Sequence, residues 1–96
     1  KNVGITDILQ ITAQYFEIPI DILQGVSRKQ KILKARQIAI YLCREITHES
    51  LNSIGYHFSN LHHASVLYAY NKVKSAMESK PKLKEDIRKL HTLIVN

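Results

Sequence analysis

Cysteine, glycine, proline and long hydrophobic runs are all scarce in this 96-residue sequence, and tryptophan is absent. No apolar run approaches the roughly 20 residues that a membrane-spanning helix requires, so we expect no integral membrane association. The single cysteine, Cys43, cannot form an internal disulfide, which is typical of proteins kept in a reducing compartment. We therefore expect a cytoplasmic protein.

The three glycines and two prolines leave long segments free to form helices, and no segment alternates apolar and polar residues as a strand would. Apolar residues recur instead at the i, i+3, i+4 spacing of amphipathic helices. The sequence predicts an all-α fold of about six helices in one domain covering residues 1–96. Because the chain begins with Lys1 instead of methionine, we expect it to be part of a longer protein. The expected helices run from about Thr6 to Phe16, between Pro19 and Gly25, from about Lys31 to Ile46, from Thr47 or Ser50 to Phe58, from near His62 to Met77, and from beyond Pro81 to Ile94.

Three local features carry further expectations. Thr6 is a residue type that caps helix N-termini, and Asp7 suits the positive end of the helix dipole. Gly55 lies inside a short helix, where glycine costs about 1 kcal/mol relative to alanine, so we expect close packing against another helix. Cys43 falls on an apolar stripe and is predicted to be an inert core residue.

Positive charge is concentrated in one part of the chain. The formal net charge is +6, and no acidic residue occurs between Asp21 and Glu45. A block of one sign repels itself, so an anionic partner would stabilise it, although a solvated helix face is the alternative. Nucleic acid is the favoured partner, and weak binding to acidic lipids comes second. The cations of this interval are Arg28, Lys29, Lys31, Lys34, Arg36 and Arg44.

The stretch "SIGYHFSNLHHASVLYAY" predicts two helices joined by a tight turn at Ser59-Asn60, the pattern of a helix-turn-helix. In that motif the second helix enters the DNA major groove with its N-terminal residues at the base edges. His62, His63 and Ser65 could exchange hydrogen bonds with bases or phosphates, and Ala64 could contact a thymine methyl group. Because imidazole gains charge between about pH 5 and 8, we predict tighter binding at mildly acidic pH.

Other uses of the histidine pair fit less well. Adjacent residues on a helix point about 100° apart, so His62 and His63 cannot readily share one metal ion. No Ser-His-Asp or Cys-His arrangement can be assembled, and the glycines do not form a phosphate-binding loop. We predict no enzyme activity, no metal, no cofactor and no small-molecule substrate.

At this point the residues resemble a known family. The segment "ARQIAIYLCREITHESLNSIGYHF", followed by "HHASVLYAYNKV", is similar to the C-terminal DNA-binding domain of the DnaA family of bacterial replication initiators. The family signature is an Arg-Gln pair opening a long helix, a leucine-led short helix ending in Ile-Gly-x-x-Phe, and a helix that reads the DnaA box. The resemblance covers essentially the whole chain and implies a helix-turn-helix domain of the DnaA C-terminal or Trp-repressor-like type.

The resemblance implies a role for each matching position. Arg28 would enter the minor groove beside the box, while backbone amides at Leu51 and Asn52 would meet a phosphate. His63 and Ala64 would touch bases, with Ser65 next to them. The resemblance also implies double-stranded DNA at the replication origin as the partner, a nucleoid-associated location, and ATP bound only by an upstream ATPase domain outside this segment. The positions that would contact the DNA backbone from the long helix are Lys34, Arg36, Gln37 and Arg44.

The chain departs from the family where specificity is decided. Ser59-Asn60-Leu61-His62 stands where the family usually has Gly-Gly-Arg-Asp, and Ala64 stands where it has threonine. Each lost base contact is worth on the order of 1–3 kcal/mol, so we expect general duplex binding with an altered base preference.

Two alternatives stay open at this stage. The first is a protein-interaction module that uses the stripe of Leu83, Ile87, Leu90 and Ile94, although such a stripe more often closes a domain's own core. The second is a diverged paralogue of the initiator without box specificity. No heptad seam or self-complementary patch is evident, so we expect a monomer.

Overall fold

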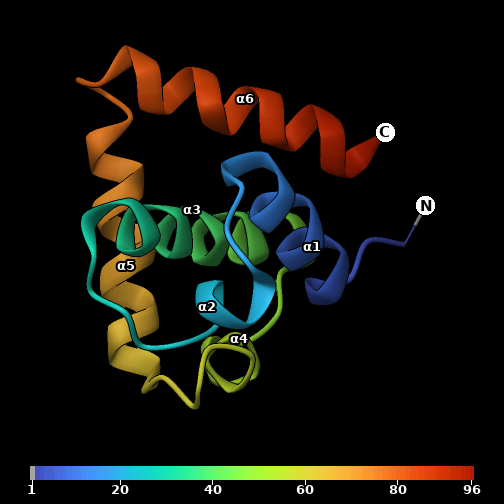
Figure 1. The fold of residues 1–96 in the computed structure, drawn as a ribbon, viewed down its shortest axis with the longest axis vertical. Helices are drawn as coiled ribbons and strands as arrows, with labels where there is room; N and C mark the ends of the chain where they lie inside the picture. Colours follow the sequence, from blue (N-terminus) through green and yellow to red (C-terminus); the bar gives the residue numbers. More distant parts are fainter. Residues whose placement is uncertain (1) are drawn as a thin grey trace.

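The computed structural model describes residues 2–96, and within them every regular element is an α-helix, as predicted (Figure 1). The predicted boundaries hold to within a few residues. The helices are α1 (Ile5–Phe16), α2 (Ile20–Leu23), α3 (Gln30–Thr47), α4 (Leu51–Tyr56), α5 (His63–Ala76) and α6 (Pro81–Val95).

Helix α3 is the centre of the fold. It packs against α1 on one side and α5 on the other, and Figure 1 shows α5 crossing it steeply. The predicted stripe along α3 is buried, with Ala39 and Cys43 fully enclosed. Burial raises the pKa of the Cys43 thiol to about 12, because a thiolate would lose its hydration there. Cys43 is therefore an unreactive core residue, as predicted.

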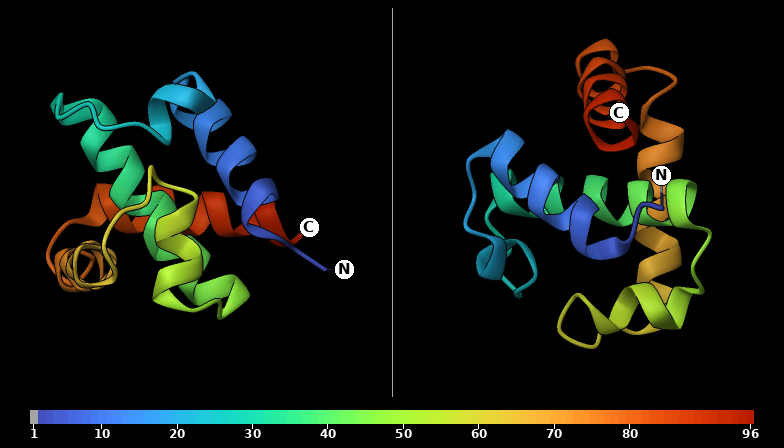
Figure 2. Two further views of the ribbon diagram at one scale, coloured as in Figure 1. Left: turned by 90° about the horizontal axis from the view of Figure 1, so that it is seen from below. Right: turned by 90° about the vertical axis from the view of Figure 1, so that its right-hand side faces the viewer.

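Helix α6 closes the core instead of offering its apolar stripe to a partner. Ile87, Leu90 and Ile94 are buried against the rest of the domain, with α6 lying across α1 and α3 (Figures 1 and 2). Asp86 on the same side accepts a hydrogen bond of 2.7 Å from the Tyr15 hydroxyl of α1. The stripe thus has an internal role. Within residues 2–96, no helix has both the length and the apolar character needed to cross a membrane.

The first helix begins earlier than its sequence suggests. The prediction that Thr6 is the N-cap is wrong: Gly4 is the N-cap, and Thr6 lies inside the first turn of α1. The reason is Asp7, whose carboxylate accepts a hydrogen bond of 3.0 Å from the Gly4 N–H. The carboxylate therefore satisfies a backbone donor ahead of the helix, and the first turn can start at Ile5.

The glycine inside α4 is required by a close backbone approach. A Cβ atom at Gly55 would lie 2.1 Å from the Leu61 carbonyl oxygen, which is backbone and cannot move aside. The Leu61 N–H also donates a hydrogen bond of 3.0 Å to the Gly55 carbonyl. The expected close packing against another helix is also present, because Val66 of α5 lies 3.3 Å from the same Cβ position, although the turn after α4 approaches more closely.

Candidate DNA-binding interface

Helices α4 and α5 form the predicted helix-turn-helix. Ser50 caps α4 by accepting a hydrogen bond of 3.0 Å from the Ser53 N–H. The turn passes through Ser59 and Asn60 with φ angles of 59° and 56°, the left-handed region. Fully buried Val66 anchors α5 against the core, so the opposite side of that helix faces solvent.

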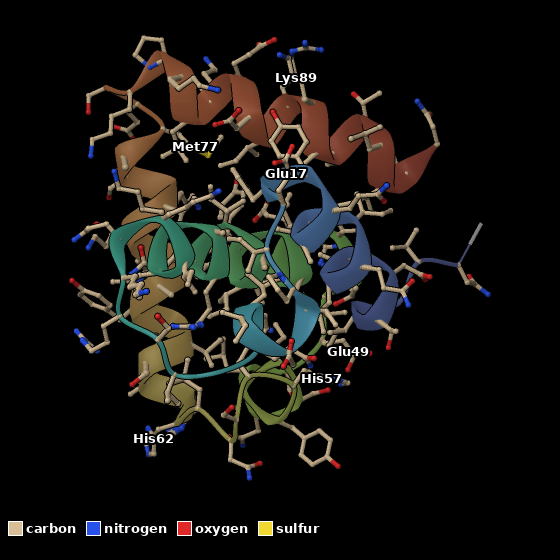
Figure 3. The ribbon with its side chains drawn as sticks, viewed as in Figure 1. Glu17, Glu49, His57, His62, Met77 and Lys89 are labelled. Atoms are coloured by element: carbon tan, nitrogen blue, oxygen red, sulfur yellow. The ribbon has the colours of Figure 1, made fainter. Side chains whose placement is uncertain are left out.

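The N-terminal end of α5 presents the residues predicted to read bases. His62, His63, Ala64 and Ser65 are all exposed, and Figure 3 shows His62 at the free lower end of the helix. His62 is also the N-cap: its Nδ1 accepts a hydrogen bond of 3.1 Å from the Ala64 N–H. Its ring stacks on His63 with 4.2 Å between centroids. Sequence reasoning did not predict that His62 is an N-cap. The signal was available, because the family has aspartate at this position and aspartate is a preferred N-cap residue.

Arg36 has a structural role that the sequence did not reveal. Its side chain is 7% exposed, and its guanidinium donates hydrogen bonds to the carbonyls of Leu23 (2.9 Å), Ser27 (2.7 Å) and Ile22 (3.2 Å). Burial, followed by the charge of Arg28, lowers the pKa of Arg36. The guanidinium of Arg36 therefore holds the end of α2 and the loop that follows, and its predicted contact with the DNA backbone stays a prediction.

The loop after α2 is also fixed to the turn before α5. The Gln24 Nε2 atom donates a hydrogen bond of 2.8 Å to the His57 carbonyl. In return the Ser59 hydroxyl donates one of 2.7 Å to the Gln24 carbonyl. These contacts join segments more than 30 residues apart, with Arg28 a few residues beyond them. In Figures 1 and 2 the loop and the first turn of α5 lie at the same side of the molecule.

The other predicted backbone contacts have mixed environments. The four remaining cations from Arg28 to Lys34 are exposed, and Gln37 is half-buried. Arg44 is half-buried and donates a hydrogen bond to the Glu49 carbonyl, so it also braces the segment leading into α4. Leu51 is half-buried and Asn52 is exposed at the start of α4. The exposed cations are Arg28, Lys29, Lys31 and Lys34.

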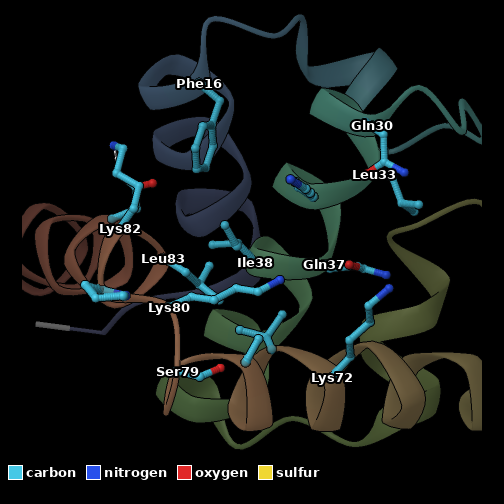
Figure 4. A pocket seen from close by; sticks show the side chains of 15 residues that line it. Phe16, Gln30, Leu33, Gln37, Ile38, Lys72, Ser79, Lys80, Lys82 and Leu83 are labelled. Atoms are coloured by element: carbon cyan, nitrogen blue, oxygen red, sulfur yellow. Dashed lines mark hydrogen bonds and ion pairs between the residues drawn. The ribbon is translucent and has the colours of Figure 1, made fainter.

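A groove between the first half of α3 and the second half of α5 extends this surface. Lys34 and Gln37 line it from α3, and Lys72 lines it from α5. In Figure 4 the side chains of Gln37 and Lys72 point toward each other. Sequence reasoning did not include Lys72, although a spacing of eight residues from Ala64 places the two side chains about 80° apart around the helix axis, on the same broad exposed face.

Metal ligands do not gather at this surface. Within the described residues no group of three or more His, Cys, Asp and Glu side chains lies close enough to hold a metal ion. The expectation that the His62 and His63 side chains point about 100° apart is wrong: His62 is the N-cap with non-helical backbone angles, and its ring stacks on that of His63.

Comparison with known proteins identifies the fold and the motif. The family model described as the bacterial dnaA protein helix-turn-helix matches residues 5–73, which include α1 to α4 and most of α5. The chain belongs to the bacterial DnaA family. As a DnaA-family helix-turn-helix domain it is a DNA-binding module and not an enzyme, which agrees with the resemblance read from the sequence.

Individual DnaA relatives match most of the chain. The chromosomal replication initiator protein DnaA of Leifsonia xyli is 42% identical over 89 residues, which is 93% of this chain and 19% of the relative. DnaA of Corynebacterium aurimucosum is 38% identical over 96 residues, 100% of this chain and 18% of the relative. DnaA of Levilactobacillus brevis is 41% identical over 78 residues, 81% of this chain and 17% of the relative. The chain thus spans about a fifth of the length of these relatives.

Proposed function

We propose that this domain binds double-stranded DNA at DnaA boxes of a replication origin, during initiation of chromosomal replication, with an altered base preference. The first turn of α5 lies in a major groove and Arg28 lies in the adjacent minor groove. The observation that carries the proposal is the pair of hydrogen bonds between Gln24 and the turn, at His57 and Ser59. They hold the basic loop and the tip of α5 in one rigid arrangement before DNA arrives, which lowers the ordering cost of binding.

Phosphate neutralisation supplies most of the affinity in this proposal. The exposed cations lie on the loop, on the start of α3 and, at Lys72, on α5. Each phosphate neutralised by a cation releases counterions and adds about −0.9 to the slope of log K against log salt. With about five such contacts we expect a slope between about −4 and −5. A narrow A·T-rich minor groove strengthens the attraction for Arg28.

Base recognition falls to the tip of α5. His63 and Ser65 carry hydrogen-bonding groups, and Ala64 offers a methyl group for contact with thymine. Only one of the two ring nitrogens of His62 is available to a base. Its Nδ1 accepts the hydrogen bond that caps α5, so Nε2 remains. The family aspartate at this position would instead present acceptor oxygens. We therefore propose that preference shifts at the base pair facing His62.

An anisotropy titration tests the proposal. A labelled duplex with a DnaA box and a scrambled duplex of equal composition are titrated with the 96-residue chain at about 50 and about 200 mM salt. We expect tighter binding to the box, a steep loss with salt, and a uniform loss for Arg28→Ala. Lys89→Ala, on α6, is the matched control and should bind as the unmodified chain does.

Each other outcome has a distinct meaning. Equal binding of both duplexes would contradict box recognition and favour the diverged paralogue. Binding to neither duplex, by a chain with normal helical content, would contradict the proposal as a whole and favour a protein-interaction module.

A further inference from the structure

Tyr68 is an exposed tyrosine on the recognition helix without an internal role. Its side chain is 63% exposed, and within residues 2–96 its hydroxyl has no hydrogen-bond partner. Two other tyrosines differ in this respect: the Tyr15 hydroxyl bonds to Asp86, and the Tyr70 hydroxyl bonds to Glu45 while its ring stacks on Tyr41. No hydrogen bond within residues 2–96 therefore accounts for the hydroxyl group at position 68.

Tyr68 belongs to a row that begins at the predicted base-reading tip. Ala64, Tyr68 and Lys72 follow one another at four-residue spacing on the side of α5 away from Val66, and all three are exposed. We call them the outer row. Side chains of a helix lean toward its N-terminus, so Tyr68 leans toward Ala64 and the DNA end of α5. Ala64 is small and leaves space in front of the ring.

Lys72 limits where the Tyr68 ring can go. The Lys72 Nζ atom lies 5.9 Å from the centroid of the Tyr68 ring, a cation–π distance. The ammonium thereby lies over a face of the ring and leaves the hydroxyl, which lies in the ring plane, open to a partner outside the chain. Lys72 also lines the groove beside Gln37, where a phosphate could be neutralised. The outer row thus carries a cation at Lys72, beside the groove, and a hydroxyl at Tyr68, one turn closer in sequence to Ala64.

We propose that the Tyr68 hydroxyl reads a base-pair edge in the major groove, one helical turn beyond Ala64. This inference rests on the proposed function, because it requires α5 to lie in that groove. A phenol can both donate and accept a hydrogen bond, so it suits the mixed pattern of groups on base edges. Residues four apart rise about 6 Å along a helix, and a side chain that leans toward the N-terminus shortens the axial distance from its tip to the earlier residue. Tyr68 can therefore supply a hydroxyl at the interface close to Ala64, which has none.

The experiment compares Tyr68→Phe with the unmodified chain. The preferred duplex of the unmodified chain is first selected from randomised duplexes, and each base pair is then substituted in turn. We expect Tyr68→Phe to bind the preferred duplex about tenfold more weakly, and to lose discrimination at one base pair, as for one lost base contact. Its binding to a scrambled duplex should be unchanged. Tyr56→Phe is the control, because Tyr56 is 73% exposed but lies on α4.

The outcomes separate this inference from the proposed function. An equal loss on preferred and scrambled duplexes would mean a phosphate contact and would overturn the inference. Selective binding that Tyr68→Phe leaves intact would overturn the inference alone. A chain that selects no sequence from the randomised duplexes would overturn both. Because Tyr68 is exposed, Tyr68→Phe should keep the thermal stability of the unmodified chain, and circular dichroism checks this.

Discussion

At the scale of single residues, Arg36 shows how burial changes the meaning of a charged side chain. Its position in the Arg-Gln pair and its place in a basic interval both favoured a phosphate contact. In the folded domain its three hydrogen bonds are directed inward to the carbonyls of Ile22, Leu23 and Ser27. A planar guanidinium suits this arrangement, because it presents several N–H groups in a fixed fork.

Arg36→Ala should therefore act on stability. We expect the free energy of unfolding to fall by about 2–3 kcal/mol, because buried carbonyls lose their donors. Arg36→Lys should recover only part of this, since an ammonium cannot match the fork. Urea denaturation followed by circular dichroism measures both variants. If Arg36→Ala were as stable as the unmodified chain but bound DNA more weakly, the result would refute the structural role and support a contact between Arg36 and the DNA backbone.

At the scale of elements, the turn between α4 and α5 carries a strain that the family usually avoids. Ser59 and Asn60 adopt left-handed backbone angles where the family pattern has two glycines. Asparagine tolerates this region, but for serine it costs about 1–2 kcal/mol. The Ser59 hydroxyl offsets part of this cost through its hydrogen bond to the Gln24 carbonyl.

Two substitutions at Ser59 separate strain from hydrogen bonding. Ser59→Ala should lower the free energy of unfolding by about 1 kcal/mol, because it loses the hydrogen bond and keeps the strain. Ser59→Gly loses the same bond but relieves the strain, so it should be nearly neutral. Thermal or urea denaturation measures the difference. If the two variants were equally destabilised, the strain would not be present.

The elements themselves could be predicted, and the contacts between them could not. The 3.6-residue spacing of apolar residues predicted the longer helices, while Pro19 and Gly25 marked the bounds of α2. Pro81 was expected to precede the last helix, but it lies in the first turn of α6, where proline fits. The cap at Gly4 was missed because glycine at an N-cap has no side-chain signal, and only Asp7 could have indicated it. The bonds from Gln24 and Arg36 join segments by tertiary packing, which no local pattern encodes. The same holds for the Leu61 carbonyl that requires Gly55.

At the scale of the whole molecule, the proposed function depends on hydrogen bonds that brace two parts proposed to contact DNA. Gln24 lies at the end of α2, and its contacts to His57 and Ser59 fix the basic loop against the helix-turn-helix. Neither part alone would neutralise phosphates in register with base contacts. The brace lets one rigid body meet adjacent grooves of a duplex.

Gln24→Ala tests the brace without removing any charge. We expect affinity for the preferred duplex to fall by about three- to tenfold, because the loop loses one of its two bonds to the turn, at His57, and is held less rigidly before binding. The salt slope should not change, since the number of neutralised phosphates is the same. Anisotropy titrations at several salt concentrations measure both quantities. A reduced slope would show that Gln24→Ala loses phosphate contacts, and unchanged affinity would show that the brace is dispensable.

The most direct test of the central claim is an NMR titration of the isotopically labelled chain with a duplex that contains a DnaA box. The account predicts that the amide signals of two separate segments, Ser27–Lys31 and His62–Ser65, shift together and saturate at one equivalent of DNA. Signals of α6 should stay in place. Shifts confined to one of the two segments, or centred on α6, would contradict the claim that the loop and the tip of α5 meet the same double helix.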